Sequence, residues 1–180
     1  DNEPALSDNK TIWIRNGKDL QEIDEWKNGN TIKLMADLNL PNYTILAESN
    51  PVSFKFDGNN HTITYNNASD SSDKKGLIGR AKDIEIKDLT VHSSIKFTAN
   101  SEQIVSCLVA QVQKGKIENC KCIIDGLDFS AIGNIYGLTF GGIVGEVTNY
   151  IKENYSGDVI INNCEISSTV PLDFSTTQNN

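Results

Sequence analysis

The sequence predicts an all-β fold, a right-handed parallel β-helix with a short helix covering its N-terminal end. The main observation is a pattern that occurs three times, with starting points roughly 31 and 35 residues apart. The three copies are residues 76–97, 107–129 and 142–174, called here the first, second and third repeats. Copies of this length are typical of a solenoid, in which each repeat buries its apolar residues against its neighbours.

Each repeat opens with a segment of period two, which predicts a strand. The central position of the inward row is Gly or Ala, so we expect a thin core in which the opposite wall comes too close for a larger side chain. The predicted inward rows are Leu77, Gly79 and Ala81 in the first repeat, Leu108, Ala110 and Val112 in the second, and Ile143, Gly145 and Val147 in the third.

A second strand follows after a shift in the apolar alternation. The shift falls on Asp88, Asn119 and Asn163. Because Asp and Asn tolerate left-handed backbone angles, we expect the chain to turn a corner at each of these residues. An apolar pair further along each repeat predicts a third short strand, and these pairs are Ile95 with Phe97, Leu127 with Phe129, and Leu172 with Phe174.

Upstream of the repeats, the sequence predicts one amphipathic helix from Leu20 to Trp26. Leu20, Ile23 and Trp26 share one face, Asn16 is the candidate N-cap, and Gly29 follows the end. The terminal turn of a solenoid has an unpaired edge and an open core, so we expect this helix to cover it.

The predicted organisation is a flexible segment over residues 1–11, a single β-helix domain over residues 12–174, and a tail or linker over residues 175–180. The formal charge of −8 argues against a nucleic-acid partner, because such binding depends on Lys and Arg at the phosphates. No run of about 18 apolar residues occurs, so we expect no membrane-spanning segment.

Residues capable of catalysis or metal binding are few and scattered. His61 and His92 fall in different turns and have no recurring spacing to a cysteine. Strand parity explains Cys120 and Cys122 as two inward side chains. Cys120 and Cys164 occupy equivalent positions, which permits either a disulfide or free thiols, and buried thiols are the simpler reading. We therefore expect no catalytic, cofactor-binding or metal-binding residue.

Polysaccharide lyases and hydrolases also use parallel β-helices, so a polysaccharide-binding or polysaccharide-degrading protein is the alternative. Such enzymes need carboxylates gathered on one outer face. The residues that precede the corner in the three repeats are Lys87, Glu118 and Asn162, which give mixed charge and no acidic row. This pattern favours a protein that is not an enzyme.

The Gly-Leu-Ile-Gly run at residues 76–79 and the Gly-Gly-Ile-Val-Gly run at residues 141–145, each followed by its corner motif, resemble the GLUG repeat of bacterial surface proteins. The region from Leu20 to Ile63 resembles the leader that precedes such repeats. The second repeat departs from the pattern, with Cys107 and Ala110 where Gly is usual.

Proteins with GLUG repeats include cell-surface adhesins and the non-catalytic region of immunoglobulin A peptidases. The zinc-binding HExxH motif of those peptidases does not occur in this sequence. The resemblance implies a secreted or cell-surface interaction or adhesion module of a bacterium. Its expected partner is a protein or glycan on a host or neighbouring cell, and no cofactor is implied.

One row on the outward face of the first strand is apolar where a solvated wall should be polar. Either an insertion between the second and third repeats covers this row, or a partner contacts it. The candidate interaction surface therefore comprises Ile78, Val109 and Val144 in the repeats, and Ile132, Ile135 and Tyr136 in the insertion.

Overall fold

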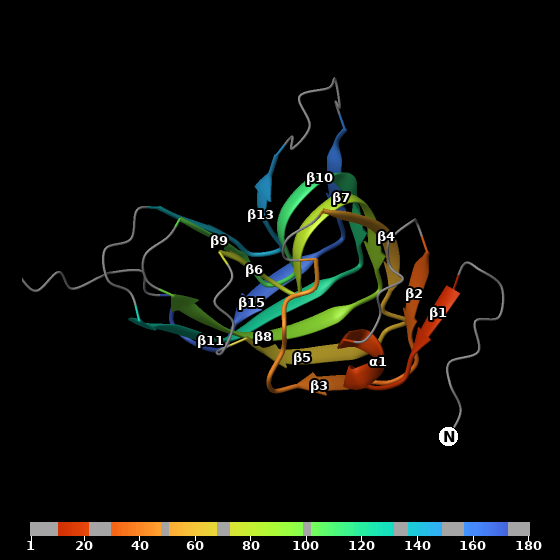
Figure 1. Ribbon diagram of the computed structural model, residues 1–180, viewed down its shortest axis with the longest axis horizontal. Coiled ribbons are helices and arrows are strands. Elements are labelled where there is room, and N and C mark those ends of the chain that lie inside the picture. The colour runs from red at the N-terminus through yellow and green to blue at the C-terminus, as the bar shows by residue number, and fades with distance from the viewer. Residues whose placement is uncertain are drawn as a thin grey trace, which may run out of the picture.

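The computed structural model describes residues 11–21, 30–47, 51–67, 73–98, 102–131, 137–148 and 157–172. These residues are mostly β, and they form three sheets in which every strand pairing is parallel (Figure 1). Within the described ranges, the only helix is α1 (Gly17–Gln21). The predicted all-β class with parallel sheets is confirmed.

Sheet A has the strand order β1-β2-β4-β7-β10-β13, and β14 also pairs with β10. Its strands are β1 (Thr11–Ile14), β2 (Thr31–Leu34), β4 (Val52–Asp57), β7 (Ile78–Lys87), β10 (Val109–Glu118), β13 (Val144–Val147) and β14 (Val159–Asn162).

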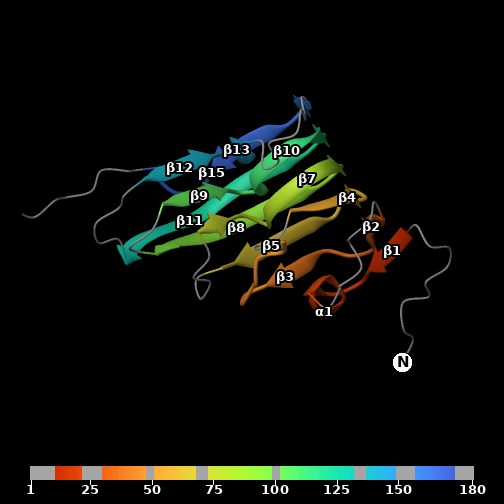
Figure 2. The same ribbon diagram turned by 45° about the horizontal axis from the view of Figure 1, so that its top comes forward.

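Sheets B and C are smaller. Strand order follows chain order in all three sheets, so successive passages of the chain stack from one end of the molecule to the other, as the colours in Figure 2 show. Sheet B comprises β3 (Leu38–Leu40), β5 (Thr62–Asn66), β8 (Thr90–Thr98), β11 (Lys121–Ala131) and β15 (Glu165–Ser168), and sheet C comprises β6 (Lys74–Lys75), β9 (Gln103–Ser106) and β12 (Leu138–Gly141).

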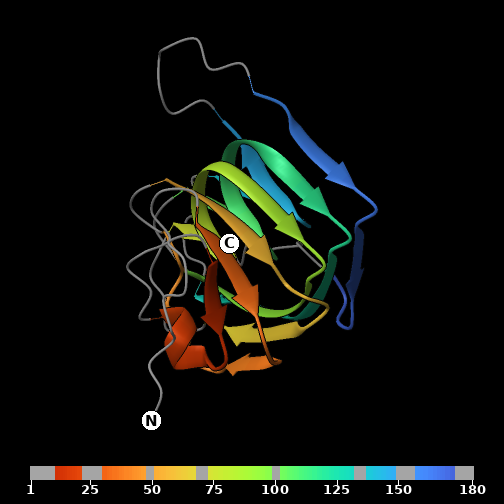
Figure 3. The ribbon, with the colours of Figure 1, turned by 90° about the vertical axis from the view of Figure 1, so that its right-hand side faces the viewer.

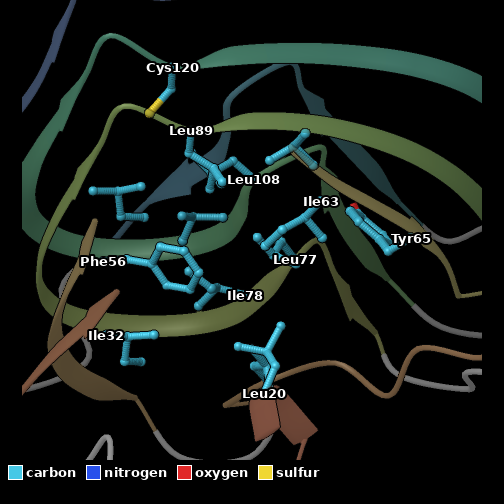
Figure 4. Close-up of a cluster of buried hydrophobic side chains, with 14 of the residues drawn as sticks. Leu20, Ile32, Phe56, Ile63, Tyr65, Leu77, Ile78, Leu89, Leu108 and Cys120 are labelled. Carbon is cyan, nitrogen blue, oxygen red and sulfur yellow. The ribbon is translucent and has the colours of Figure 1, made fainter. Parts of the chain in front are cut away.

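The period-two pattern of the strands produces continuous apolar rows across the sheets. Residues that pair in register lie one above the other, and the side chains of each row, apart from the last in the third repeat (Ile161 and Ile166), belong to one core cluster (Figure 4). The row in sheet A consists of Ile12, Ile32, Phe56, Ile86, Ile117 and Ile161. The row in sheet B consists of Leu38, Ile63, Val91, Cys122 and Ile166.

The repeats align as their sequences predict. Ile78 pairs with Val109, and Val109 pairs with Val144. The adjacent residues are aligned too, since the Ile78 N–H donates to the Leu108 carbonyl at 2.9 Å. The small residue in the predicted inward row of the third repeat has a steric cause. A Cβ on Gly145 would lie 2.5 Å from the Ala110 carbonyl oxygen and 2.8 Å from Ile104 Cγ2 of sheet C.

The predicted corners are confirmed by backbone geometry. Asp88, Asn119 and Asn163 have φ angles of 52°, 51° and 49°, which lie in the left-handed region that Asn and Asp tolerate. Each corner joins a strand of sheet A to a strand of sheet B. Figure 3 shows the two sets of strands meeting at these bends along one side of the stack.

In the first two repeats the predicted third strand is wrong. In the third repeat Leu172 lies in no strand, and Phe174 lies outside the described residues. β8 runs unbroken through Ile95 and Phe97, and β11 runs through Leu127. Ser93 is a buried polar residue in the inward row of β8, so it interrupts the apolar pattern without ending the strand. The third sheet instead comes from β6, β9 and β12, which precede the repeats and which the apolar pattern did not predict.

The described part of the predicted helix covers the first passage of the chain. Asn16 is its N-cap, because its Oδ1 accepts a hydrogen bond from the Asp19 N–H at 2.9 Å. Leu20 is fully buried in the main core cluster, and α1 packs against β1 and β3. Ile23 and Trp26 lie outside the described residues.

Candidate interaction surface

The structure brings Ile78, Val109 and Val144 into one row, as the register of sheet A requires. Ile78 and Val109 are fully buried members of the main core cluster, and Val144 is half-buried against it. Figure 4 shows Ile78 among the side chains of the core. These side chains therefore contribute to stability. Ile132, Ile135 and Tyr136 lie outside the described residues.

Both histidines pair with an aspartate. His92 Nδ1 lies 2.7 Å from Asp125 Oδ2, and the Thr169 hydroxyl donates to Asp125 Oδ1 at 3.1 Å. In a nucleophilic triad the imidazole lies between the carboxylate and the hydroxyl, whereas here the carboxylate lies between them. The Thr169 hydroxyl therefore only donates a hydrogen bond to Asp125. No imidazole accepts its proton, so this arrangement does not make Thr169 a nucleophile.

His61 Nδ1 lies 3.1 Å from Asp37 Oδ1, and the Thr62 N–H donates to the same oxygen at 2.9 Å. The Thr62 N–H and the His61 ring together lower the pKa of Asp37 from its usual value. The pair joins the turn before β5 to the turn before β3. These contacts link the two turns, so the His61–Asp37 pair has a structural role.

The four cysteines are free thiols, and three of them are buried. Burial raises the pKa of Cys120 to about 12, and a hydrogen bond with Cys107 together with burial raises the pKa of Cys122. The thiolate is the nucleophile and the metal ligand, so these environments make both cysteines inert. The described ranges contain no group of three or more His, Cys, Asp or Glu residues that could hold a metal ion.

The outer face of sheet A carries charges that pair with one another. A shallow depression of about 120 Å³, well below the usual volume of a small-molecule site, lies between β4 and β7. Of its charged lining residues, Lys55 pairs with Glu85 at 3.1 Å, and Asp83 pairs with Lys114 at 2.8 Å. Lysines on the neighbouring strands therefore neutralise the carboxylates of Glu85 and Asp83, which do not form a catalytic pair.

The third repeat differs from the other two in exposure. Val147, Ile161 and Ile166 are 57%, 46% and 44% exposed. Their register partners in the second repeat, Val112, Ile117 and Cys122, are fully buried. The same inward rows are therefore covered in the second repeat and open in the third.

The backbone at this end is open as well. β12, β13, β14 and β15 each pair with one described strand of the preceding passage, and no described strand pairs with their other edge. This surface, comprising the free edges of β12 to β15 and the exposed Val147, Ile161 and Ile166, is called here the terminal edge. Sequence reasoning missed it, because the apolar pattern of the third repeat matches that of the second and gives no sign of the difference in exposure.

Comparison with known proteins identifies no relative, because no protein-family model, no curated protein and no solved structure matches this chain. Within the described part of the chain, the structure contains no helix with the length and apolar character needed to cross a membrane.

Proposed function

We propose that this chain is a non-catalytic interaction or adhesion module, extracellular or on a bacterial cell surface, built on a right-handed parallel β-helix. Support for the β-helix comes from the three parallel sheets, each of which is extended with every repeat, by one strand or, for sheet A in the third repeat, by the two strands β13 and β14. Further support comes from the corners at Asp88, Asn119 and Asn163, which occur at equivalent positions in the three repeats.

The observation that carries the proposal is the terminal edge. Contiguous exposed apolar residues on a folded domain usually mark a contact site. An unpaired strand edge offers a row of N–H and C=O groups to which another strand can add. Val147, Ile161 and Ile166 each combine an exposed apolar side chain with an unpaired strand edge, and all three lie at the same end of the stack.

The likeness of the repeats to the GLUG repeats of adhesins supports the surface location. Partners in that setting are proteins or glycans of a host or neighbouring cell. The terminal edge favours a protein, because strand addition uses backbone hydrogen bonds and apolar side chains that a polysaccharide lacks.

The test is to display the chain on a non-adherent bacterium and to measure attachment to immobilised host matrix proteins and to glycan arrays. We expect attachment to a protein, and we expect it to be lost in a variant with Ile161→Lys and Ile166→Lys. Thr64→Lys, an exposed change on β5 far from the terminal edge, is the matched control and should leave attachment unchanged.

Two outcomes would contradict the proposal. Attachment that survives the double lysine variant would place the binding surface elsewhere. Cleavage of acidic polysaccharides by the purified chain would favour the lyase alternative.

A further inference from the structure

Neighbouring strands of this protein are matched by charge as well as by shape. At many positions where charged residues pair in register, the two charges are opposite and their side chains form an ion pair. The in-register pairs are Lys33 with Asp57 (3.6 Å), Asp57 with Lys87 (3.5 Å), Lys55 with Glu85 (3.1 Å), Asp83 with Lys114 (2.8 Å), Lys96 with Asp128 (3.7 Å) and Lys121 with Glu165 (3.1 Å). Charge therefore helps to specify which strand lies beside which.

The third repeat has charges of only one sign at its described positions. Residues 142–148 and 157–172 contain Glu146, Asp158 and Glu165 and no Lys or Arg. Glu165 pairs with Lys121 of the second repeat, and Glu146 accepts a hydrogen bond from the Gln111 side chain at 2.5 Å. A strand added on the other side would meet three carboxylates.

The corner residues form a directional ladder that ends at the same surface. The Asn119 amide donates to Asp88 Oδ1 at 3.0 Å, and the Asn163 amide donates to Asn119 Oδ1 at 2.7 Å. Each Nδ2 group thus donates to the preceding repeat, and each Oδ1 accepts from the following one. Asn163 Oδ1 is the acceptor at the end of this ladder, so a further strand would need a donor beside it.

We infer that the terminal edge binds a partner polypeptide that adds parallel β-strands carrying Lys or Arg opposite Glu146, Asp158 and Glu165, with an amide donor opposite Asn163. This inference rests on the proposed function and specifies the partner's chemistry. Apolar residues of the partner cover Val147, Ile161 and Ile166, continuing the rows that already join the repeats. The ionic pairs select the partner and its register, and the apolar contacts supply most of the affinity.

A second copy of this chain fits the terminal edge poorly. Two third repeats placed edge to edge bring together Glu146, Asp158 and Glu165 from both copies, and the described residues of that repeat offer no cation to separate them. Like charges across strands destabilise the pairing. The acidic residues of the terminal edge therefore disfavour pairing with a second copy of this chain and favour pairing with a basic strand.

The probe for this inference is a fluorescent synthetic peptide with the sequence of residues 109–124, with serine in place of both cysteines. Within the protein this segment already lies beside the third repeat, with Lys121 opposite Glu165 and Gly115 opposite Val159, the residue after Asp158. In this register the peptide presents lysines opposite Asp158 and Glu165 and an asparagine opposite Asn163, while Gln111 lies opposite Glu146 and supplies an amide donor there. Fluorescence anisotropy at low and high salt measures its binding to the whole chain.

Three comparisons decide the outcome. A peptide with Lys114→Glu and Lys121→Glu should bind the chain about tenfold more weakly, as expected for the loss of two exposed ion pairs and the gain of repulsion. The Asp158→Lys and Glu165→Lys double variant of the protein should bind this reversed peptide in preference to the original. Glu85→Lys, an acid-to-base change two strands away from β13 and β14, is the control and should leave peptide binding unchanged.

Equal binding of both peptides would overturn the charge inference while leaving an apolar docking edge, and hence the proposed function, in place. Failure of both peptides to bind would also overturn it, and the attachment assay tests the proposed function separately. Sedimentation that shows a dimer lost in Asp158→Lys would identify a second copy as the occupant and would likewise overturn the inference.

Discussion

The same apolar row reaches both ends of the strand stack, but it is buried at the N-terminal end and exposed at the other. At the N-terminal end, Ile12 is only 9% exposed although its strand is the first of sheet A, and Leu20 of α1 is fully buried in the same core cluster. At the other end, Ile161 lies in the same row and is 46% exposed. The residue type and the row are the same, so the difference arises from what lies beside each end.

This difference teaches that repetition alone cannot finish such a stack. Each repeat covers the apolar row of the one before it and exposes its own. At the N-terminal end the non-repeating α1 packs against β1 and β3, and within the described residues no such element lies beside the third repeat. The terminal edge therefore remains competent for a further contact.

The largest expected effect on stability comes from a buried charge in the apolar row of sheet A, compared with the same charge at the exposed end of that row. Ile117→Asp should lower the free energy of unfolding by at least about 3 kcal/mol, because it buries an unpaired carboxylate. Ile161→Asp should cost less than about 1 kcal/mol, because its side chain is half in water. Urea unfolding curves of both variants measure the two values. Equal losses would mean that the end of the row is covered as well as its middle.

Removing the side chain that helps to close the N-terminal end should have the next largest effect. Leu20→Ala should cost about 2–4 kcal/mol for a fully buried leucine. We expect hydrogen exchange to accelerate first in β1, β2 and β3. Leu172→Ala, at a leucine that is 46% exposed, is the matched control and should cost about 0.5 kcal/mol. If Leu20→Ala were as mild as the control, α1 would not be closing the core.

The corner ladder predicts a smaller, graded effect. Asn119→Ala should cost about 1–2 kcal/mol, because alanine is strained at a φ of 51°. Asn119→Gly should recover part of this cost by relieving the strain, without restoring the two amide contacts. Asn163→Ala should cost less than Asn119→Ala, since Asn163 makes one ladder contact and Asn119 makes two. Thermal unfolding would contradict the ladder if the glycine variant were as stable as the parent.

The smallest effect concerns Glu118, a half-buried acid in sheet A. A hydrogen bond from Lys116 is the main cause that lowers its pKa, with a second from Asn162. A lowered folded-state pKa stabilises the protein above the unfolded-state pKa of about 4.3, and that contribution is lost as pH falls through the folded-state pKa. Lys116→Ala should raise the Glu118 pKa toward its usual value in an NMR titration. Lys55→Ala is the control, and an equal shift there would show a general field effect.

Much of the strand stacking could be predicted because it depends on local chemistry. Period-two apolar segments and the Asn or Asp corners specify which residues face inward and where the chain bends, and both appear in the structure. The unbroken β8 could not be predicted, because Ser93 is polar by type and buried only by its place in the row. Sheet C could not be predicted either, because β6 contains Lys74 and Lys75, which are buried despite their charge.

The sequence by itself determined the inward rows, the corners and the helix cap at Asn16, because each follows from side-chain polarity and backbone preference within a few residues. Only the tertiary structure decided which members of a row are covered. Ile78 and Val109 seemed to form an outer stripe but are interior, whereas Ile161 and Ile166 seemed to belong to the core but are exposed. Burial depends on a neighbouring strand that lies 30 or more residues away in the sequence, or that has no counterpart among the described residues, and no local pattern records it.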